Sequence, residues 1–281
     1  MKYFTNTAMC ELESNCIAQD AEMLLQGARK VDLDEFPSLK YMYRAGIGSE
    51  NMPLAQIQER GIQVWYPPMS VREEISKAVA ELTWSFVMHS NTFARSDLDT
   101  WKRDKRPSMS DVRTLVIGSG NIGTLVGRGL GSQVQYYDIR SSMPPELKDK
   151  LGWADIVTLH IPSTCINLGV VVAYNKGFID EEKLSWMKPG ATLINTSRGD
   201  VVDEIAVCDW LSKDMENKYY ADVHGEEPYD GMFNGYQGTQ FFGTPHMASY
   251  NTRVVRGNTD FAQGLMDTLD GKTDESPVPE G

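Results

Sequence analysis

The chain has 281 residues, which is long enough for two domains or one large domain and allows a substantial buried core. Its formal net charge of −12 argues against a nucleic-acid-binding or anionic-membrane-binding protein, because neither partner would be attracted to it. The four cysteines lack the spacing of a disulfide framework or a metal site, and no apolar run is long enough to cross a bilayer, so we expect a reduced, cytoplasmic protein without a bound metal.

The N-terminal quarter of the chain is predicted to form a small α/β unit. Short apolar runs separated by glycine and proline are typical of strands, and longer mixed segments between them suit helices. We expect strands over residues 2–5, 39–44 and 62–65, and helices over residues 20–28 and 54–60.

A loop with two glycines follows the strand over residues 39–44. Arg44 is followed by Ala-Gly-Ile-Gly, which ends at Gly48. Such a loop can direct backbone N–H groups at a carboxylate, and it can equally be a plain connecting turn. These residues alone do not decide between the two interpretations.

A long helical pattern begins at Ser70. Apolar residues recur at intervals of three and four from Val71 to Phe86, and glutamates occupy the first turn, where the helix dipole favours them. The segment that follows, residues 93–110, is polar and basic, and we interpret it as a solvated arm. A helix of this length suits a domain connection or a dimer face, so we expect a homodimer.

A glycine motif marks a predicted dinucleotide-binding unit. An apolar strand leads into Gly118-Ser-Gly120-Asn-Ile-Gly123, and a helix-compatible segment follows directly. In this order Gly118 permits the turn, Gly120 lets a pyrophosphate approach the backbone, and Gly123 lets the helix pack on the strand. The structural alternative is an ordinary strand–turn–helix unit that binds nothing.

An aspartate at the end of the next strand strengthens the cofactor interpretation. Asp138 lies twenty residues after Gly118, where a carboxylate would bind the ribose hydroxyls of NAD and repel the 2′-phosphate of NADP. Arg140 could neutralise such a phosphate, so a minor NADP activity stays open. We therefore expect NAD as the cofactor, with NADP as the less favoured one.

The rest of the chain continues the alternation of strands and helices. Such an alternation predicts a parallel, doubly wound sheet, whose strands end on a common edge where ligands bind. We expect strands over residues 154–162, 188–195, 218–223 and 240–243, and helices over residues 179–186 and 202–211.

Three polar residues follow successive predicted strands and could perform chemistry together. His246 could protonate the alkoxide that forms when a ketone accepts a hydride, and Glu227 could stabilise the resulting imidazolium. Arg198 could hold a substrate carboxylate through its planar guanidinium. Singly, each has a structural alternative: Arg198 could pair with Asp200 or Asp222, Glu227 could be a solvated carboxylate, and His246 could be a structural histidine.

The other histidines are weaker catalytic candidates. His89 falls within the long helix, and His224 lies very close to the end of a strand. His160 follows a strand on the cofactor side, so we expect it to line the adenosine part of the cofactor rather than to transfer protons.

Taken together, the motifs resemble the D-isomer-specific 2-hydroxyacid dehydrogenases, in particular the phosphoglycerate dehydrogenase-like members. The similarity extends over about residues 39–272 and consists of several motifs in a fixed order. The matching positions are residues 44–51, 79–81, 118–123, Asp138, 154–162, 187–199, Asp222, Val223, Glu227, Pro228, Pro245 and His246.

The resemblance implies a role for each residue at a matching position. Arg198 would anchor the substrate carboxylate and carbonyl, Glu227 would be the partner of His246, and His246 would be the general acid and base. The amides of Ile47 and Gly48 would hold the substrate carboxylate. The implied cofactor-binding residues are Gly118, Gly120, Asn121, Ile122, Gly123, Asp138, His160, Pro162, Thr196 and Asp222, the last of them near the nicotinamide carboxamide.

The resemblance also implies an α/β fold with two domains. A doubly wound parallel Rossmann sheet would form an NAD-binding domain over residues 79–251. A smaller, flavodoxin-like substrate domain would combine residues 1–78 with residues 252–281. Because the segment before Arg44 is short for this family, we expect a truncated substrate domain. Residues 138–154 are also compressed, which would remove a strand.

The function implied is that of an NAD-dependent oxidoreductase that interconverts a small D-2-hydroxyacid and its 2-keto acid. Arg44 is similar to the basic residue that helps phosphoglycerate dehydrogenases hold a phosphate, so a phosphorylated substrate such as 3-phosphoglycerate is the first expectation. The alternative is a non-catalytic, NAD(H)-sensing protein like the corepressors that share this fold. The short N-terminal domain favours the alternative, and the intact catalytic residues disfavour it.

Overall fold

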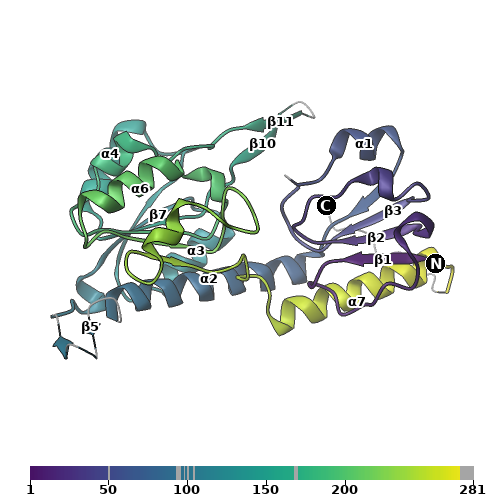
Figure 1. The fold of residues 1–281 in the computed structure, drawn as a ribbon, viewed down its shortest axis with the longest axis horizontal. Coiled ribbons are helices and arrows are strands. Elements are labelled where there is room, and N and C mark those ends of the chain that lie inside the picture. Colours follow the sequence, from purple (N-terminus) through teal and green to yellow (C-terminus); the bar gives the residue numbers. More distant parts are fainter. Residues whose placement is uncertain are drawn as a thin grey trace. The chain divides into compact units, whose positions relative to one another are not determined.

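The chain folds into two compact units. The computed structural model describes residues 1–49, 51–92, 96–97, 99, 101–103, 105–167 and 170–272. The first unit combines Met1–Ile75 with the C-terminal segment from Ser249, and the second comprises Ser76–Ala248 (Figure 1). The first unit is therefore discontinuous in sequence, because the C-terminal helix completes it.

A four-stranded parallel sheet forms the centre of the first unit. Its strands follow the chain in the order β1 (Tyr3–Asn6), β2 (Met23–Gln26), β3 (Tyr41–Arg44) and β4 (Gln63–Trp65). Helix α1 (Leu54–Glu59) packs on one face, and α7 (Thr252–Leu269) packs on the other. A flavodoxin-like sheet has the order 2-1-3-4-5, and the loss of its second strand would leave this sequential order. The shortening of this domain stays a prediction.

The helix predicted over residues 20–28 is wrong. Its centre is the strand β2, whose four residues are all buried, and a 3₁₀ helix, Ala18–Asp20, precedes it. A central strand of a parallel sheet is covered on both faces, so its sequence has no apolar–polar alternation. A short apolar run of this kind does not distinguish a strand from a buried helical segment.

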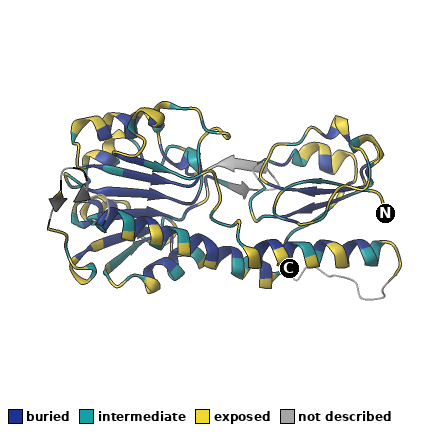
Figure 2. Cartoon of the chain, turned by 60° about the horizontal axis from the view of Figure 1, so that its bottom comes forward, coloured by how far each residue is buried: buried dark blue, intermediate teal, exposed yellow. Residues whose placement is uncertain are grey.

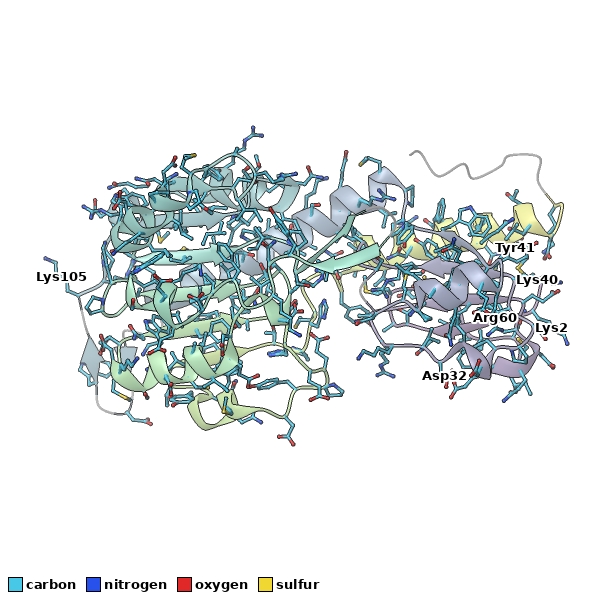
Figure 3. The ribbon with its side chains drawn as sticks, turned by 90° about the horizontal axis from the view of Figure 1, so that it is seen from above. Lys2, Asp32, Lys40, Tyr41, Arg60 and Lys105 are labelled. Carbon is cyan, nitrogen blue, oxygen red and sulfur yellow. The ribbon has the colours of Figure 1, made fainter. Side chains whose placement is uncertain are left out.

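The connection between β2 and β3 contains no α-helix and is fixed by side chains. Residues 33–35 form a 3₁₀ helix, Leu33–Glu35. Arg60 lies at the end of α1 and is labelled in Figure 3. Its guanidinium donates hydrogen bonds to the carbonyls of Leu33 and Phe36, at 2.6 and 2.5 Å. These bonds satisfy backbone groups that a helix would otherwise pair internally.

A six-stranded parallel sheet forms the centre of the second unit. The order β14-β13-β12-β9-β7-β8 places the first strand of this sheet, β7, between β8 and β9. The connections thus run to opposite sides of β7, which is the switch point of a doubly wound sheet and the usual position of a ligand. The strands are β7 (Arg113–Ile117), β8 (Gln133–Tyr137), β9 (Ile156–Leu159), β12 (Thr192–Asn195), β13 (Lys218–Ala221) and β14 (Phe241–Gly243).

Helices cover this sheet and form its apolar core together with the strands. Helix α2 (Met69–Thr92) is the long helix predicted from residue 70, and its Phe86 and Val87 pack with Ile156, Ile194 and Tyr220 of the sheet. The inner strands are almost wholly buried (Figure 2). The other helices are α3 (Asn121–Gly129), α4 (Pro144–Trp153), α5 (Glu181–Ser185) and α6 (Glu204–Lys213).

Two antiparallel hairpins extend the second unit. The predicted arm over residues 93–110 contains β5 (Ser96–Asp97) and β6 (Lys102–Arg103), although part of it lies outside the described residues. The hairpin of β10 (Thr164–Asn167) and β11 (Val170–Ala173) follows β9. Between Asp138 and Ala154, α4 is present and no strand occurs, as the compressed sequence predicted. Among the described residues, no helix is both long and apolar enough to cross a membrane.

Candidate active site

The glycine motif forms a tight turn between β7 and α3. Gly118 has a φ of 101°, and a Cβ atom there would overlap the carbonyl oxygen of His160. A Cβ atom at Gly123 would overlap the carbonyl oxygen of Gly118. At Gly120, by contrast, no heavy atom lies within 4 Å of the position of a Cβ atom. The open backbone at Gly120 and the free first turn of α3 leave room for a pyrophosphate, which fits NAD.

Asp138 follows β8 and accepts hydrogen bonds at both carboxylate oxygens. Oδ2 accepts bonds from the backbone N–H and the hydroxyl of Ser119, at 3.0 and 2.8 Å. Oδ1 accepts bonds from the backbone N–H and Nε of Arg140, at 3.0 and 3.2 Å. Burial alone would raise the pKa of Asp138, but the bonds from Arg140 and Ser119 hold this pKa well below its usual range. The carboxylate is therefore charged, as ribose binding requires.

His160 stands beside the glycine turn in the loop after β9. Its Nε2 lies 2.8 Å from the hydroxyl oxygen of Thr158, and its Nδ1 is buried without a hydrogen-bond partner among the described residues. Burial lowers the pKa of His160 to about 3, so the ring is neutral. A neutral imidazole with one nitrogen that makes no hydrogen bond to the described protein residues can bind a ligand at this edge. In the same loop, the side-chain amide of Asn175 donates a hydrogen bond of 2.6 Å to the carbonyl of Pro162.

Arg198, Glu227 and His246 follow three adjacent strands, β12, β13 and β14. The Nδ1 atom of His246 lies 2.8 Å from Oε2 and 3.1 Å from Oε1 of Glu227. This hydrogen bond raises the pKa of His246, and the charge of Arg198 opposes that rise. Burial alone would raise the pKa of Glu227, but the hydrogen bond and the charge of His246 lower this pKa below its usual value. His246 and Glu227 thus form a hydrogen-bonded pair, and the charge of Arg198 acts on His246.

Asp222 holds the loop that carries His246. Asp222 is only 1% exposed, and its carboxylate accepts hydrogen bonds from the hydroxyl of Thr244 and the backbone N–H groups of Met247 and Ala248, at 2.6, 2.8 and 2.9 Å. Burial raises the pKa of Asp222 despite these bonds. The motif placed Asp222 near the nicotinamide, and the structure adds this anchoring contact, which the sequence did not reveal.

Thr196, another predicted cofactor residue, lies in the interior of the second unit. Its hydroxyl oxygen is 2.9 Å from that of Thr83 in α2, and its residue is 6% exposed. The contact fixes the start of the loop that leads from β12 to Arg198. The side chain therefore has a clear packing role.

The predicted substrate loop belongs to the first unit. Arg44 is 5% exposed, and its Nε donates a hydrogen bond of 2.8 Å to the carbonyl of Gly48. This bond closes the loop on itself, while the Ile47 side chain is exposed. Arg44, Ile47 and Gly48 thus lie together in one loop of the first unit. The glycine turn and the residues Arg198, Glu227 and His246 belong to the second unit.

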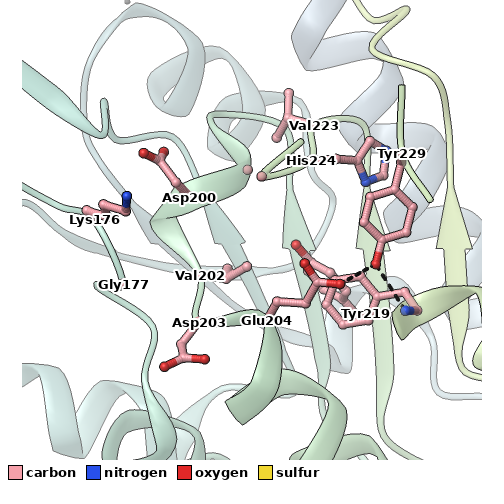
Figure 4. A pocket seen from close by; sticks show the side chains of 13 residues that line it. Lys176, Gly177, Asp200, Val202, Asp203, Glu204, Tyr219, Val223, His224 and Tyr229 are labelled. Carbon is pink, nitrogen blue, oxygen red and sulfur yellow. Dashed lines mark hydrogen bonds between the residues drawn. The ribbon is translucent and has the colours of Figure 1, made fainter. Parts of the chain in front are cut away.

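A pocket of about 320 Å³ lies beside the segments that carry Arg198 and Glu227 (Figure 4). Asp200, Glu204, His224 and Tyr229 are among the residues that line it. The hydroxyl of Tyr229 donates a hydrogen bond of 2.5 Å to Glu204, so these two groups satisfy each other. Across the described part of the chain, no cluster of histidine, cysteine, aspartate and glutamate could hold a metal ion.

Comparison with known families agrees with the resemblance seen in the motifs. Residues 78–248 match the family model described as the NAD binding domain of D-isomer specific 2-hydroxyacid dehydrogenases. D-lactate dehydrogenase of Lactobacillus delbrueckii subsp. bulgaricus is 28% identical over 268 residues, which cover 84% of this chain and 77% of the relative. D-3-phosphoglycerate dehydrogenase of Escherichia coli is 31% identical over 195 residues, covering 65% of this chain and 46% of the relative. The chain thus spans about half the length of the phosphoglycerate dehydrogenases that it matches.

Solved structures share the fold. D-lactate dehydrogenase of Aquifex aeolicus, complexed with NAD and lactic acid, has a TM-score of 0.71 at 21% identity, covering 90% of this chain and 84% of that one. Phosphoglycerate oxidoreductase of Vibrio cholerae has a TM-score of 0.73 at 17% identity, covering 91% and 86%. The predicted α/β fold, with a Rossmann sheet and a second, smaller domain, is confirmed.

Proposed function

Because the chain belongs to the D-isomer-specific 2-hydroxyacid dehydrogenase family, we propose that it interconverts a small D-2-hydroxyacid and its 2-keto acid with NAD as the cofactor. The observation that carries this proposal is the bond of 2.8 Å between His246 and Glu227, with the charge of Arg198 acting on the same imidazole. This set combines a proton donor, the group that tunes it and a cation for an acidic substrate. The same set disfavours the NAD-sensing alternative, which needs no proton donor.

His246 would transfer the proton. Because Nδ1 faces Glu227, Nε2 is the nitrogen that can meet the substrate oxygen. In keto-acid reduction the imidazolium donates its Nε2 proton to the oxygen that becomes a hydroxyl, and in oxidation the neutral imidazole removes that proton. Glu227 stabilises the charged form and fixes the ring, which is the usual role of a carboxylate beside a catalytic histidine.

Arg198 and the loop of the first unit would bind the substrate. A guanidinium binds a carboxylate through two parallel hydrogen bonds and can also polarise the neighbouring carbonyl. The backbone amides of Ile47 and Gly48 would hold the same carboxylate, and the bond from Arg44 to Gly48 supports that loop. These contacts would fix the orientation of the substrate around its 2-keto carbon.

The residues of the glycine turn fit NAD. Gly118 and Gly123 have no room for a Cβ atom and so allow the tight turn, whereas Gly120 leaves open space for the cofactor. The charged Asp138 suits ribose hydroxyls and opposes a 2′-phosphate. When bound, NAD supplies or accepts the hydride. The other residues proposed to hold it are Asn121, Ile122, His160, Pro162, Thr196 and Asp222.

The identity of the substrate and the oligomeric state are further proposals. The Escherichia coli relative and Arg44 support 3-phosphoglycerate, whereas the bond from Arg44 to its own loop supports an unphosphorylated acid.

The length of α2 supports a homodimer, which sedimentation of the purified protein would test.

A screen of 2-keto acids tests the proposed activity. Purified protein is mixed with NADH and either pyruvate, glyoxylate, hydroxypyruvate or its 3-phosphate, and NADH loss is followed by absorbance. At least one acid should be reduced, and the preference for the phosphorylated or the unphosphorylated form reports on Arg44. Tight NADH binding without oxidation by any acid would refute the proposal.

A further inference from the structure

One residue, His224, contacts both segments that carry the His246–Glu227 pair. The backbone N–H of His224 donates a hydrogen bond of 3.1 Å to Oε1 of Glu227. The ring of His224 extends the other way, where its Nε2 lies 3.0 Å from the carbonyl oxygen of Thr244, two residues before His246. The backbone and the side chain of His224 therefore link the segment after β13 with the segment after β14.

The acceptor on Thr244 determines the state of the His224 ring. A carbonyl oxygen can only accept a hydrogen bond, so Nε2 of His224 must carry the proton whether the ring is neutral or charged. The same oxygen also accepts the backbone N–H of His246 at 3.0 Å. His246 has a φ of 51°, a backbone conformation that residues other than glycine rarely adopt. The carbonyl of Thr244, which both histidines share as an acceptor, lies directly beside this residue.

The ring of His224 is itself held in place. It stacks on Tyr229, with ring centroids 4.5 Å apart and an interplanar angle of 28° (Figure 4). The hydroxyl of Tyr229 donates to Glu204 at 2.5 Å and accepts the backbone N–H of Phe233 at 3.0 Å, so this tyrosine cannot easily turn. A continuous set of contacts thus runs from Glu204 through Tyr229 and His224 to the loop of His246.

We propose that His224 is a positioning residue that sets the geometry of the His246–Glu227 pair through its bonds to Glu227 and Thr244. This inference rests on the proposed function, because the pair matters only if His246 transfers a proton. Small displacements of a proton donor reduce turnover strongly, so a residue that couples both segments should influence catalysis without touching the substrate.

Two substitutions separate the hydrogen bond from the packing. His224→Phe keeps a ring on Tyr229 but removes the donor to Thr244, whereas His224→Gln places an amide donor near the position of Nε2. His224→Phe should lower kcat for keto-acid reduction about tenfold with NADH affinity unchanged, and His224→Gln should restore a substantial part of the loss. If the phenylalanine variant does not fold, His224→Asn, whose amide is too short to reach Thr244, takes its place against His224→Gln.

Titration of the histidine rings by NMR gives a readout that does not need turnover. The chain has only four histidines, so the signal of His246 can be assigned by substitution. Loosening of the pair should lower the pKa of His246, whereas a His224 ring that only packs beside the pair would leave this pKa unchanged on removal. Glu227 and Asp222 raise this pKa and Arg198 lowers it, and all three stay in every variant.

The outcomes distinguish the two proposals. A lower pKa of His246 in His224→Phe, reversed in His224→Gln, supports the positioning role even if no keto acid is reduced, in which case only the proposed activity fails. An unchanged or raised pKa of His246, with turnover equal to that of the wild type, would overturn the positioning role and leave the proposed activity intact.

Discussion

His246 and Glu227 form a charge-assisted hydrogen bond of 2.8 Å between Nδ1 and Oε2, across the ends of the neighbouring strands β14 and β13. The carboxylate raises the pKa of His246, so the imidazolium persists to a higher pH than that of an isolated histidine. Because Nδ1 is occupied, the proposed proton transfer depends on Nε2.

Replacement of His246 by alanine should remove the proton donor and leave the cofactor turn intact. We expect kcat for keto-acid reduction to fall by about 10²–10⁴-fold, which is the usual contribution of general acid catalysis. Steady-state kinetics measure the loss, and NADH titration by fluorescence provides the control for cofactor binding. A variant with nearly normal turnover would exclude His246 as the acid.

Replacement of Glu227 by glutamine should move the pH dependence of reduction. Reduction requires the protonated imidazole, and the charged partner raises the pKa of His246. Without that charge the pKa of His246 falls. The decrease of kcat/KM for reduction with rising pH should therefore occur at a lower pH than in the wild type, and the increase of kcat/KM for oxidation should also occur at a lower pH. Profiles of kcat/KM in both directions measure the shift, and coincident profiles for both proteins would show that the pair does not control His246.

Two glycines of the same turn should respond differently to alanine. Gly123→Ala places a Cβ atom against the carbonyl of Gly118, so the free energy of unfolding should fall by about 1–3 kcal/mol. Gly120→Ala meets no atom within 4 Å, so this variant should unfold like the wild type but bind NADH more weakly. Urea unfolding and NADH titration of the two variants measure both effects. Equal stability of the two would contradict the close contact at Gly123.

Asp138 should control the choice between NAD and NADP. Its charged carboxylate, held by Ser119 and Arg140, opposes a 2′-phosphate. Asp138→Ser should weaken NADH binding and improve NADPH binding, because Arg140 is then released to meet the phosphate. The ratio of kcat/KM for the two cofactors measures the change. A ratio that stays the same would show that discrimination lies elsewhere.

The sequence predicted the parts of the site that depend on short-range geometry. The glycine turn, Asp138 and the three residues after β12, β13 and β14 follow from strand ends and fixed spacings, because a parallel sheet gathers those ends on one edge. The helix of residues 54–60 and the long helix from residue 70 were also predicted, since periodic apolar patterns of this length specify a helix.

The sequence could not predict features that depend on tertiary contacts. Residues 23–26 are buried on both faces, and only their position between β1 and β3 makes them a strand. The anchoring bonds of Asp222 and the link through His224 join residues about twenty positions apart, so no local pattern reveals them. His224 was set aside because of its closeness to the strand, and that same closeness lets it reach Thr244.

Transfer of isotope from the cofactor tests the central claim most directly. The protein is incubated with NADH that carries deuterium at both C4 positions of the nicotinamide and with the best 2-keto acid from the screen other than glyoxylate, whose reduced product has no D and L isomers. The product is analysed by mass spectrometry and chiral chromatography. The account predicts deuterium at C2 of the D-2-hydroxyacid, with the product largely absent for His246→Ala. A product without deuterium, or the L-isomer with deuterium, would contradict it.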